Sequence, residues 1–396
     1  MSDAEAVHPA ADDVVDLLAQ LVAIDSVNSD LVAGAAGESA IADWCAEWLA
    51  DRGFEVTRLE GRPGHPSIVA IARAPGAGPV LMLNGHLDTV GVEGYDGDRF
   101  SGRIDDGRLH GRGSFDTKSG VAAAMVAAAR AHAEGALRGD LVLTLVADEE
   151  FGSTGTVETL AHLAEAGIVP SAAIVLEPSA LELTVAHRGF AWFEVEFTGL
   201  AAHGSMPEQG VDAIAAAAAL LRDLDDLRQR LQQSEPHALL GHGTVRVSTI
   251  EGGTDAATVA DRCVLTVERR TLPDDDLDEV ESQLRELVER AASTVPGARG
   301  VVHRLVARAA FAADPTSAIV TTLAAQVEKV LGRPARLRGE PFWTDARLVH
   351  EAGIACVVIG ADGGGAHADT EWADCASVRA LEAVLHGVMT SSGVSP

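Results

Sequence analysis

Apolar and polar positions follow two different rhythms along the first 186 residues. Apolar side chains recur at helical spacing in several segments, which predicts helices over 12–24, 39–51, 119–134 and 154–166. Short apolar or alternating runs lie between them and predict strands over 54–59, 67–72, 80–83, 141–146 and 172–176. The turn signal Asp106-Gly107 predicts a hairpin over 102–110. Strands alternating with helices indicate an α/β domain with a mostly parallel sheet flanked by helices.

The spacing of apolar positions changes near residue 187. The following segment predicts strands over 190–197, 244–250, 263–269 and 301–307 and helices over 210–233 and 277–292. This order is typical of a compact α+β unit. Helices over 316–331 and 344–351 and a buried strand over 355–359 then restore the α/β pattern. We therefore expect a discontinuous catalytic α/β domain, residues 1–186 and 309–396, interrupted by an inserted α+β domain, residues 187–308.

The acidic composition argues against two classes of binding partner. The chain has 30 Lys and Arg residues against 59 Asp and Glu, a formal net charge of −29. Such a charge repels nucleic acids and anionic membranes, so we expect neither as a partner. No window is apolar enough to span a bilayer, and Met1-Ser2-Asp3-Ala4-Glu5 does not resemble a signal peptide. Four scattered cysteines without a CxxC pair indicate a reducing compartment, and we expect a cytoplasmic protein.

Three consecutive acids, Asp148-Glu149-Glu150, follow the apolar run over 141–146. Carboxylates at the end of a buried strand repel one another, so a positive charge should lie nearby. A divalent metal ion would supply that charge. The alternative is a solvated acidic loop, and this segment alone does not decide between them.

Other predicted strands also end in residues that can bind a metal. His86 follows the strand over 80–83, Glu177 follows 172–176, and His367 follows 355–359 after a glycine-rich stretch. Ligands of open α/β sheets bind beyond the carboxyl ends of the strands, where these side chains would meet. Asp116 begins a helix and could bridge two cations, or it could only cap that helix. Asp88 shares a face with His86 and could orient its imidazole.

Four segments together resemble the motifs of the M20 metallopeptidase family. They are Gly85-His86-Leu87-Asp88-Thr89-Val90, Gly111-Arg112-Gly113-Ser114-Phe115-Asp116-Thr117-Lys118, Asp148-Glu149-Glu150 and Gly364-Gly365-Ala366-His367-Ala368-Asp369-Thr370-Glu371-Trp372. The family includes acetylornithine deacetylases, succinyl-diaminopimelate desuccinylases, aminoacylases, dipeptidases and carboxypeptidases. The resemblance runs through almost the whole chain and implies a zinc-peptidase-like domain with an inserted lid or dimerisation domain.

The resemblance also implies roles for single residues. Two Zn²⁺ ions per subunit would be held by His86, Asp116, Glu150, Glu177 and His367. In this set Asp116 bridges the two ions, and Co²⁺ or Mn²⁺ would be substitutes for zinc. Glu149 would be the general base, and Asp88 would orient His86.

The inserted domain carries two further candidate residues and one departure from the family pattern. His203, in Ala201-Ala202-His203-Gly204-Ser205, resembles the family's lid histidine, which stabilises an oxyanion and in dimeric members reaches the partner subunit. Arg270 resembles the arginine that binds a substrate carboxylate. Ala257 stands where many members have an asparagine, so this chain lacks that polar contact with substrate.

We therefore expect a di-zinc amidohydrolase that cleaves the amide bond of N-acyl amino acids and is a homodimer through its lid domain. A dipeptidase or carboxypeptidase would use the same residues with a different pocket. A catalytically inactive metal-binding protein is the alternative from another class, but His86, Asp116 and Glu149 are all present.

Overall fold

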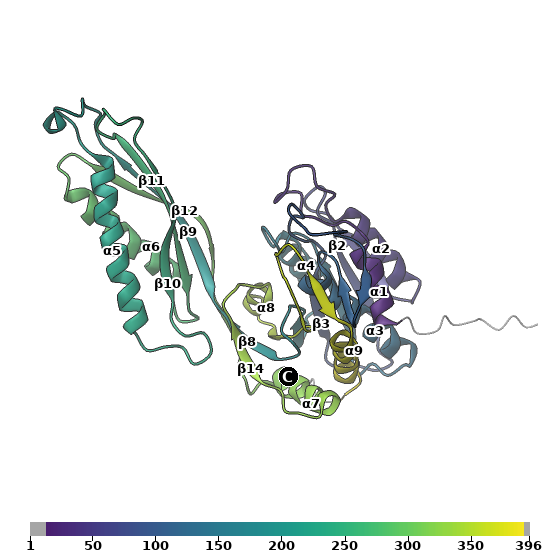
Figure 1. Cartoon of the computed structure of the whole chain (residues 1–396). Helices are drawn as coiled ribbons and strands as arrows, with labels where there is room; N and C mark the ends of the chain where they lie inside the picture. The colour runs from purple at the N-terminus through teal and green to yellow at the C-terminus, as the bar shows by residue number, and fades with distance from the viewer. Residues whose placement is uncertain (1–12, 392–396) are drawn as a thin grey trace, which may run out of the picture. The chain divides into compact units, whose positions relative to one another are not determined.

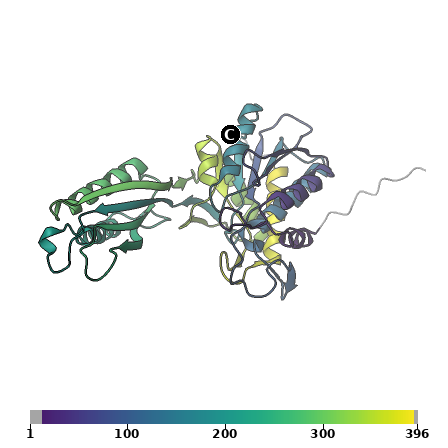
Figure 2. The same cartoon turned by 90° about the horizontal axis from the view of Figure 1, so that it is seen from above.

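The computed structural model describes residues 13–391, which form two compact units (Figures 1 and 2). The first unit contains the chain up to Val185, Ala313–Arg338 and the chain from Thr344 onward, and the second contains Ala186–Ala312 and Gly339–Trp343. Each unit has its own hydrophobic core. The boundaries and roles expected from the sequence, a catalytic domain and an inserted lid or dimerisation domain, remain a prediction. The N-terminal segment that does not resemble a signal peptide lies outside the described residues.

A nine-stranded mixed sheet forms the centre of the first unit. Its main path runs β1 (Glu55–Leu59), β2 (Ser67–Ala72), β6 (Leu141–Val146), β3 (Leu81–His86), β7 (Ala172–Val175), β15 (Ala355–Val358), β8 (Leu183–His187) and β13 (Phe311–Ala312), and β14 (Leu337–Glu340) pairs with β8. The neighbours β6, β3, β7 and β15 are parallel, whereas the other pairs along the main path are antiparallel. The expected parallel order therefore holds only at the centre of the sheet.

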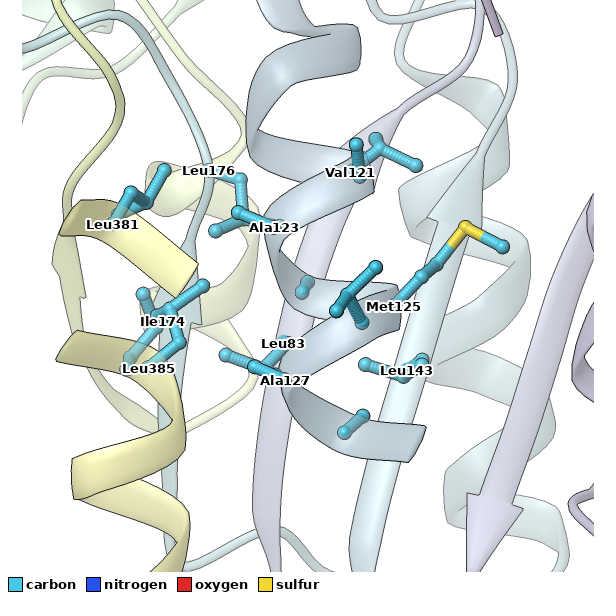
Figure 3. Packing of buried hydrophobic residues seen from close by; sticks show 14 of the residues in the cluster. Leu83, Val121, Ala123, Met125, Ala127, Leu143, Ile174, Leu176, Leu381 and Leu385 are labelled. Atoms are coloured by element: carbon cyan, nitrogen blue, oxygen red, sulfur yellow. The ribbon is translucent and has the colours of Figure 1, made fainter. Parts of the chain in front are cut away.

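Helices cover both faces of this sheet. They are α1 (Val14–Val22), α2 (Ser39–Ala50), α3 (Ser119–Ala133), α4 (Thr154–Glu165), α7 (Ala318–Leu331), α8 (Ala346–Glu351) and α9 (Cys375–Thr390). Figure 3 shows α3 lying against the sheet beside α9, with Leu83, Leu143 and Ile174 among the residues packed around them. Alanines over most of α3 let its backbone lie close to the strands. Helix α9 is outside the predicted elements, although its buried residues follow helical spacing.

A smaller four-stranded sheet joins two distant segments of the first unit. Its order is β16 (Gly363–Gly364), β17 (Trp372–Asp374), β5 (Arg108–His110) and β4 (Arg103–Asp105). The hairpin predicted over 102–110 is β4 and β5, with Asp106 and Gly107 in its turn. The pairing of β17 with β5 brings the chain before Asp116 beside the chain after His367.

The second unit is an antiparallel sheet with two helices on one face (Figures 1 and 2). The strand order is β10 (Thr244–Gly252), β11 (Arg262–Thr271), β9 (Gly189–Thr198) and β12 (Arg299–Arg308), and the helices are α5 (Ala213–Gln233) and α6 (Leu277–Ser293). Phe193, Val195 and Phe197 alternate along β9 and face the helices. Among the described residues of the whole chain, no helix has the length and apolar content of a membrane span.

Candidate metal centre

Parallel strand ends bring the predicted ligands together. His86 is the last residue of β3, and Glu150 and Glu177 follow the neighbouring strands β6 and β7. The side chains of all three are almost entirely buried, at 1%, 7% and 7% exposed. Because carboxyl ends of parallel strands share one edge of the sheet, their functional groups meet there. The solvated acidic loop that was the alternative for Asp148-Glu149-Glu150 does not form.

Two groups of ligand atoms share Asp116. Its Oδ1 lies 3.3 Å from Nε2 of His86, which is 3.9 Å from Oε1 of Glu177. Its Oδ2 lies 3.4 Å from Nε2 of His367, which is 3.1 Å from Oε2 of Glu150. Within each group, one ligand atom per residue lies within 4.8 Å of the others. Asp116 thus presents one oxygen to each group, as a ligand that bridges two cations must.

The chain reaches Asp116 through an irregular turn. Residues Ser114–Lys118 form a short kinked segment in which Asp116 has non-helical backbone angles, and α3 begins only at Ser119. The Asp116–Thr117 peptide bond is cis. No side-chain hydrogen bond caps α3 at Lys118, so the alternative reading of Asp116 as a helix cap does not apply. His367 has a φ of 59°, in the left-handed region that non-glycine residues seldom adopt.

The protein side chains alone leave this cluster short of positive charge. Burial raises the pKa of Glu149 well above its ordinary value, and the charge of Glu177 raises it further. Hydrogen bonds to Asp116 and Glu150 raise the pKa of His367 to about 10. Burial opposes protonation of His86, but nearby carboxylates outweigh it and its pKa is also raised.

The donor set fits two divalent cations. Each of the two groups that share Asp116 offers one imidazole nitrogen and carboxylate oxygens close enough together to bind one ion. Imidazole nitrogens combined with carboxylate oxygens suit several transition metals, zinc among them.

Asp88 binds the turn after β6 as well as contacting His86. Its Oδ1 accepts a hydrogen bond from the amide of Glu149, and its Oδ2 accepts one from the amide of Glu150, both at 3.1 Å. The carbonyl oxygen of Asp88 lies 3.0 Å from Nδ1 of His86, closer than its carboxylate at 3.4 Å. Because a carbonyl only accepts, Nδ1 carries a proton. In the neutral ring, Nε2 is then the nitrogen free to bind a metal beside Asp116 and Glu177.

Three polar residues near the site have no counterpart among the predicted site residues. Buried Asn28 donates from Nδ2 to Asp88 at 2.9 Å and to Asp148 at 3.1 Å. Asp345 accepts a 2.5 Å hydrogen bond from Thr156, and burial raises its pKa to about 6. Glu371 contacts the turn before α3. Of these three residues, only Glu371 could have been identified from the sequence, because it lies inside the motif that contains His367.

A third group of residues that could bind a metal is already paired with an arginine side chain. Asp30, His65 and Asp148 lie close enough to share an ion. However, the guanidinium of Arg62 pairs with Asp30 and lies 3.5 Å from Asp148. We therefore interpret this group as a structural ion-pair network.

His203 and Arg270 belong to the second unit. His203 is exposed, and Ser205 contacts its Nδ1 through the hydroxyl at 2.8 Å and the amide at 3.2 Å. Arg270 pairs with Glu268 at 2.9 Å and lies over the ring of Phe190. The carbonyl of Ala257 accepts a hydrogen bond from Gly204, next to His203. The departure at Ala257 therefore lies in direct contact with the loop of His203.

A mixed α/β sheet with these candidate ligands gathered at its edge, and a further carboxylate beside them, is the arrangement of a metal-dependent hydrolase. The chain belongs to the peptidase family M20/M25/M40, whose model matches residues 82–391. It is 32% identical over 388 residues to a succinyl-diaminopimelate desuccinylase from Cereibacter sphaeroides, covering 94% of this chain and 97% of that relative. It is 31% identical over 386 residues to an acetylornithine deacetylase from Myxococcus xanthus, covering 93% and 94%.

A solved structure shows the same fold. The aminopeptidase PepT from Bacillus cereus matches with a TM-score of 0.77 at 21% identity, covering 96% of this chain and 98% of that chain. The family assigned from the motifs is thus confirmed by the family model and by relatives along nearly the whole chain.

Proposed function

We propose that this protein is a di-zinc amidohydrolase that removes the acyl group from an N-acyl amino acid. The observation that carries the proposal is the pair of ligand groups that share Asp116, with the carboxyl of Glu149 beside them. His86 and Glu177 would hold one ion, Glu150 and His367 would hold the other, and Asp116 would contribute to both. Zinc suits this mixture of imidazole and carboxylate ligands, and Co²⁺ or Mn²⁺ would substitute.

The residues around the ions have different roles in the proposed reaction. When bound, the ions supply Lewis acidity, which lowers the pKa of water and polarises an amide carbonyl. Glu149 takes the proton of the attacking water and delivers it to the leaving amine. Asp88 keeps Glu149 and Glu150 in place through their backbone amides. Asp88 also holds His86 through its carbonyl oxygen.

The second unit supplies the remaining substrate contacts in this proposal. The guanidinium of Arg270 suits the free carboxylate of an amino acid, because its fork of donors matches two carboxylate oxygens. His203 donates a hydrogen bond to the oxyanion that forms on the carbonyl. In a homodimer formed through the lid domain, His203 acts on the partner subunit.

The relatives support the substrate class without fixing the substrate. Their names are those of a desuccinylase and a deacetylase, which both remove an acyl group from an amine. A dipeptidase or carboxypeptidase is the second candidate, because the same ligands can hydrolyse a peptide bond. A thiol nucleophile is disfavoured, since burial raises the pKa of Cys45 to about 12 and raises that of Cys356 as well.

The test combines a substrate panel with the variant Glu149→Gln. The wild-type protein with two zinc ions should hydrolyse N-acetyl, N-succinyl or N-formyl amino acids faster than dipeptides. Glu149→Gln should still bind two zinc ions, and its kcat should fall roughly 10²–10⁴-fold because the general base is lost. Exclusive cleavage of dipeptides would replace the deacylase by a dipeptidase. Full activity in Glu149→Gln would contradict the mechanism.

A further inference from the structure

The carboxylate of Glu371 is completely buried and accepts four hydrogen bonds. Its Oε2 accepts from Nη1 of Arg112 at 2.8 Å and from the amide of Gly113 at 3.0 Å. Its Oε1 accepts from the amides of Phe115 and Asp116, both at 2.9 Å. One side chain therefore fixes the backbone of the turn that presents Asp116.

The same residue ties this turn to the segment of His367. The backbone carbonyl of Glu371 accepts a hydrogen bond from Gly111 at 3.1 Å. Arg112, which pairs with the Glu371 carboxylate, also donates from Nη2 to the carbonyl of Ala368 at 2.8 Å. Ala368 directly follows His367, so Arg112 and Glu371 link the two segments from both sides.

Asp116 and His367 need such a link because each is held by an irregular backbone. Asp116 lies in the kink before α3, and His367 has a left-handed φ. Regular helix or sheet hydrogen bonds do not fix either residue. The oxygens of Asp116 must face both ligand groups at once, and a small rotation of its backbone would move both oxygens together.

We propose that Glu371 is a positioning residue that sets Asp116 and His367 for metal binding without being a ligand itself. The inference rests on the proposed function. Glu371 belongs to neither group of ligand atoms among the described residues. Asp88 performs the same task on the other side of the site, where it binds the amides of Glu149 and Glu150. Residues that orient metal ligands typically contribute 10- to 100-fold to metal affinity.

The decisive variant is Glu371→Gln, which keeps the size of the side chain. Its oxygen can still accept two hydrogen bonds, but its amide nitrogen must face two donors. The matched control is Glu382→Gln in α9, because Glu382 is a buried carboxylate that pairs with Arg130 at 2.9 Å. Arg130 lies near the end of α3 opposite to Asp116. The control thus removes the charge of a buried carboxylate paired with a partly exposed arginine, without touching a ligand segment.

Metal-free proteins would be titrated with zinc against a competing chelator, and their thermal unfolding would be recorded in parallel. Glu371→Gln should bind the weaker zinc ion roughly 10- to 100-fold less tightly than the wild type. Glu382→Gln should keep the wild-type affinity, even if its metal-free form unfolds at a lower temperature. Wild-type zinc affinity in Glu371→Gln would overturn the positioning role, whatever happens to its thermal stability.

A second variant covers the case in which Glu371→Gln does not fold. Arg112→Lys keeps a positive charge beside Glu371 but cannot also reach the carbonyl of Ala368 with a second donor. It should lower the zinc affinity by a smaller factor, and unchanged affinity would overturn the link between the two segments. If the wild type binds no zinc, the proposed function fails, and the role of Glu371 fails with it. If the wild type binds two zinc ions, the results for the variants test the role of Glu371 alone.

Discussion

At the scale of residues, the three acids after β6 have separate surroundings. Glu150 faces His367, and Glu149 lies in the cluster with its pKa raised by burial. Asp148 is fully buried with a φ of 65° and accepts hydrogen bonds from Asn28 and from Thr154. Asp148 therefore holds the turn in place instead of contributing a ligand to either group that shares Asp116.

Asn28 is the neutral donor between two buried carboxylates. Asn28→Ala should lower the free energy of unfolding by roughly 1–3 kcal/mol, because Asp88 and Asp148 each lose a buried partner. Asn28→Asp should cost more, roughly 3–5 kcal/mol, because it adds an uncompensated buried charge. Urea unfolding of the metal-free proteins measures both values. Equal losses in the two variants would show that Asn28 does not separate like charges.

At the scale of elements, the edge strand β12 bears on the proposed homodimer. β12 lies at one edge of the sheet in the second unit, and Val301 and Leu305 on it are 47% and 56% exposed. An exposed edge with apolar side chains favours pairing with a strand of another chain.

The pair of substitutions Val301→Lys and Leu305→Lys should convert a dimer into a monomer, since lysines on an edge strand oppose pairing. Ile250→Lys on the opposite edge strand β10 is the control, because Ile250 is 50% exposed as well. Sedimentation velocity measures the change. A dimer that survives the β12 substitutions but dissociates in the control would place the interface at β10.

At the scale of the whole molecule, the two cores should respond differently to metal removal. The proposed ligands all belong to the first unit, and the second unit has a separate core of apolar residues. A metal at about 100 times its dissociation constant stabilises the folded state by roughly 2.7 kcal/mol.

Removing zinc with a chelator should therefore lower the midpoint of one unfolding transition by roughly 5–10 °C and leave the other unchanged. Differential scanning calorimetry with and without the chelator measures both transitions. A single transition that shifts as a whole would mean that the two units unfold together, contrary to the predicted domains.

Local patterns in the sequence determined most of the elements and the edge of the sheet that holds the site. The proposed ligands His86 and Glu177 follow apolar runs, and the strands that end there are parallel neighbours. Such residues are predictable because ligands of open α/β sheets bind beyond the carboxyl ends of the strands. The end of an apolar run therefore marks where a site residue can lie. The antiparallel flanks of the sheet were not predictable in this way, because periodicity reports burial and not strand direction.

Only the tertiary structure decided what holds the ligands in place. Glu371 binds the amide of Asp116 across 255 residues, and Asn28 reaches Asp148 across 120. Hydrogen bonds between such distant segments leave no periodic signal in either segment. The sequence therefore determined which side chains can bind metal. The packing of the strands and turns decided which carboxylates serve as ligands and which ones position them.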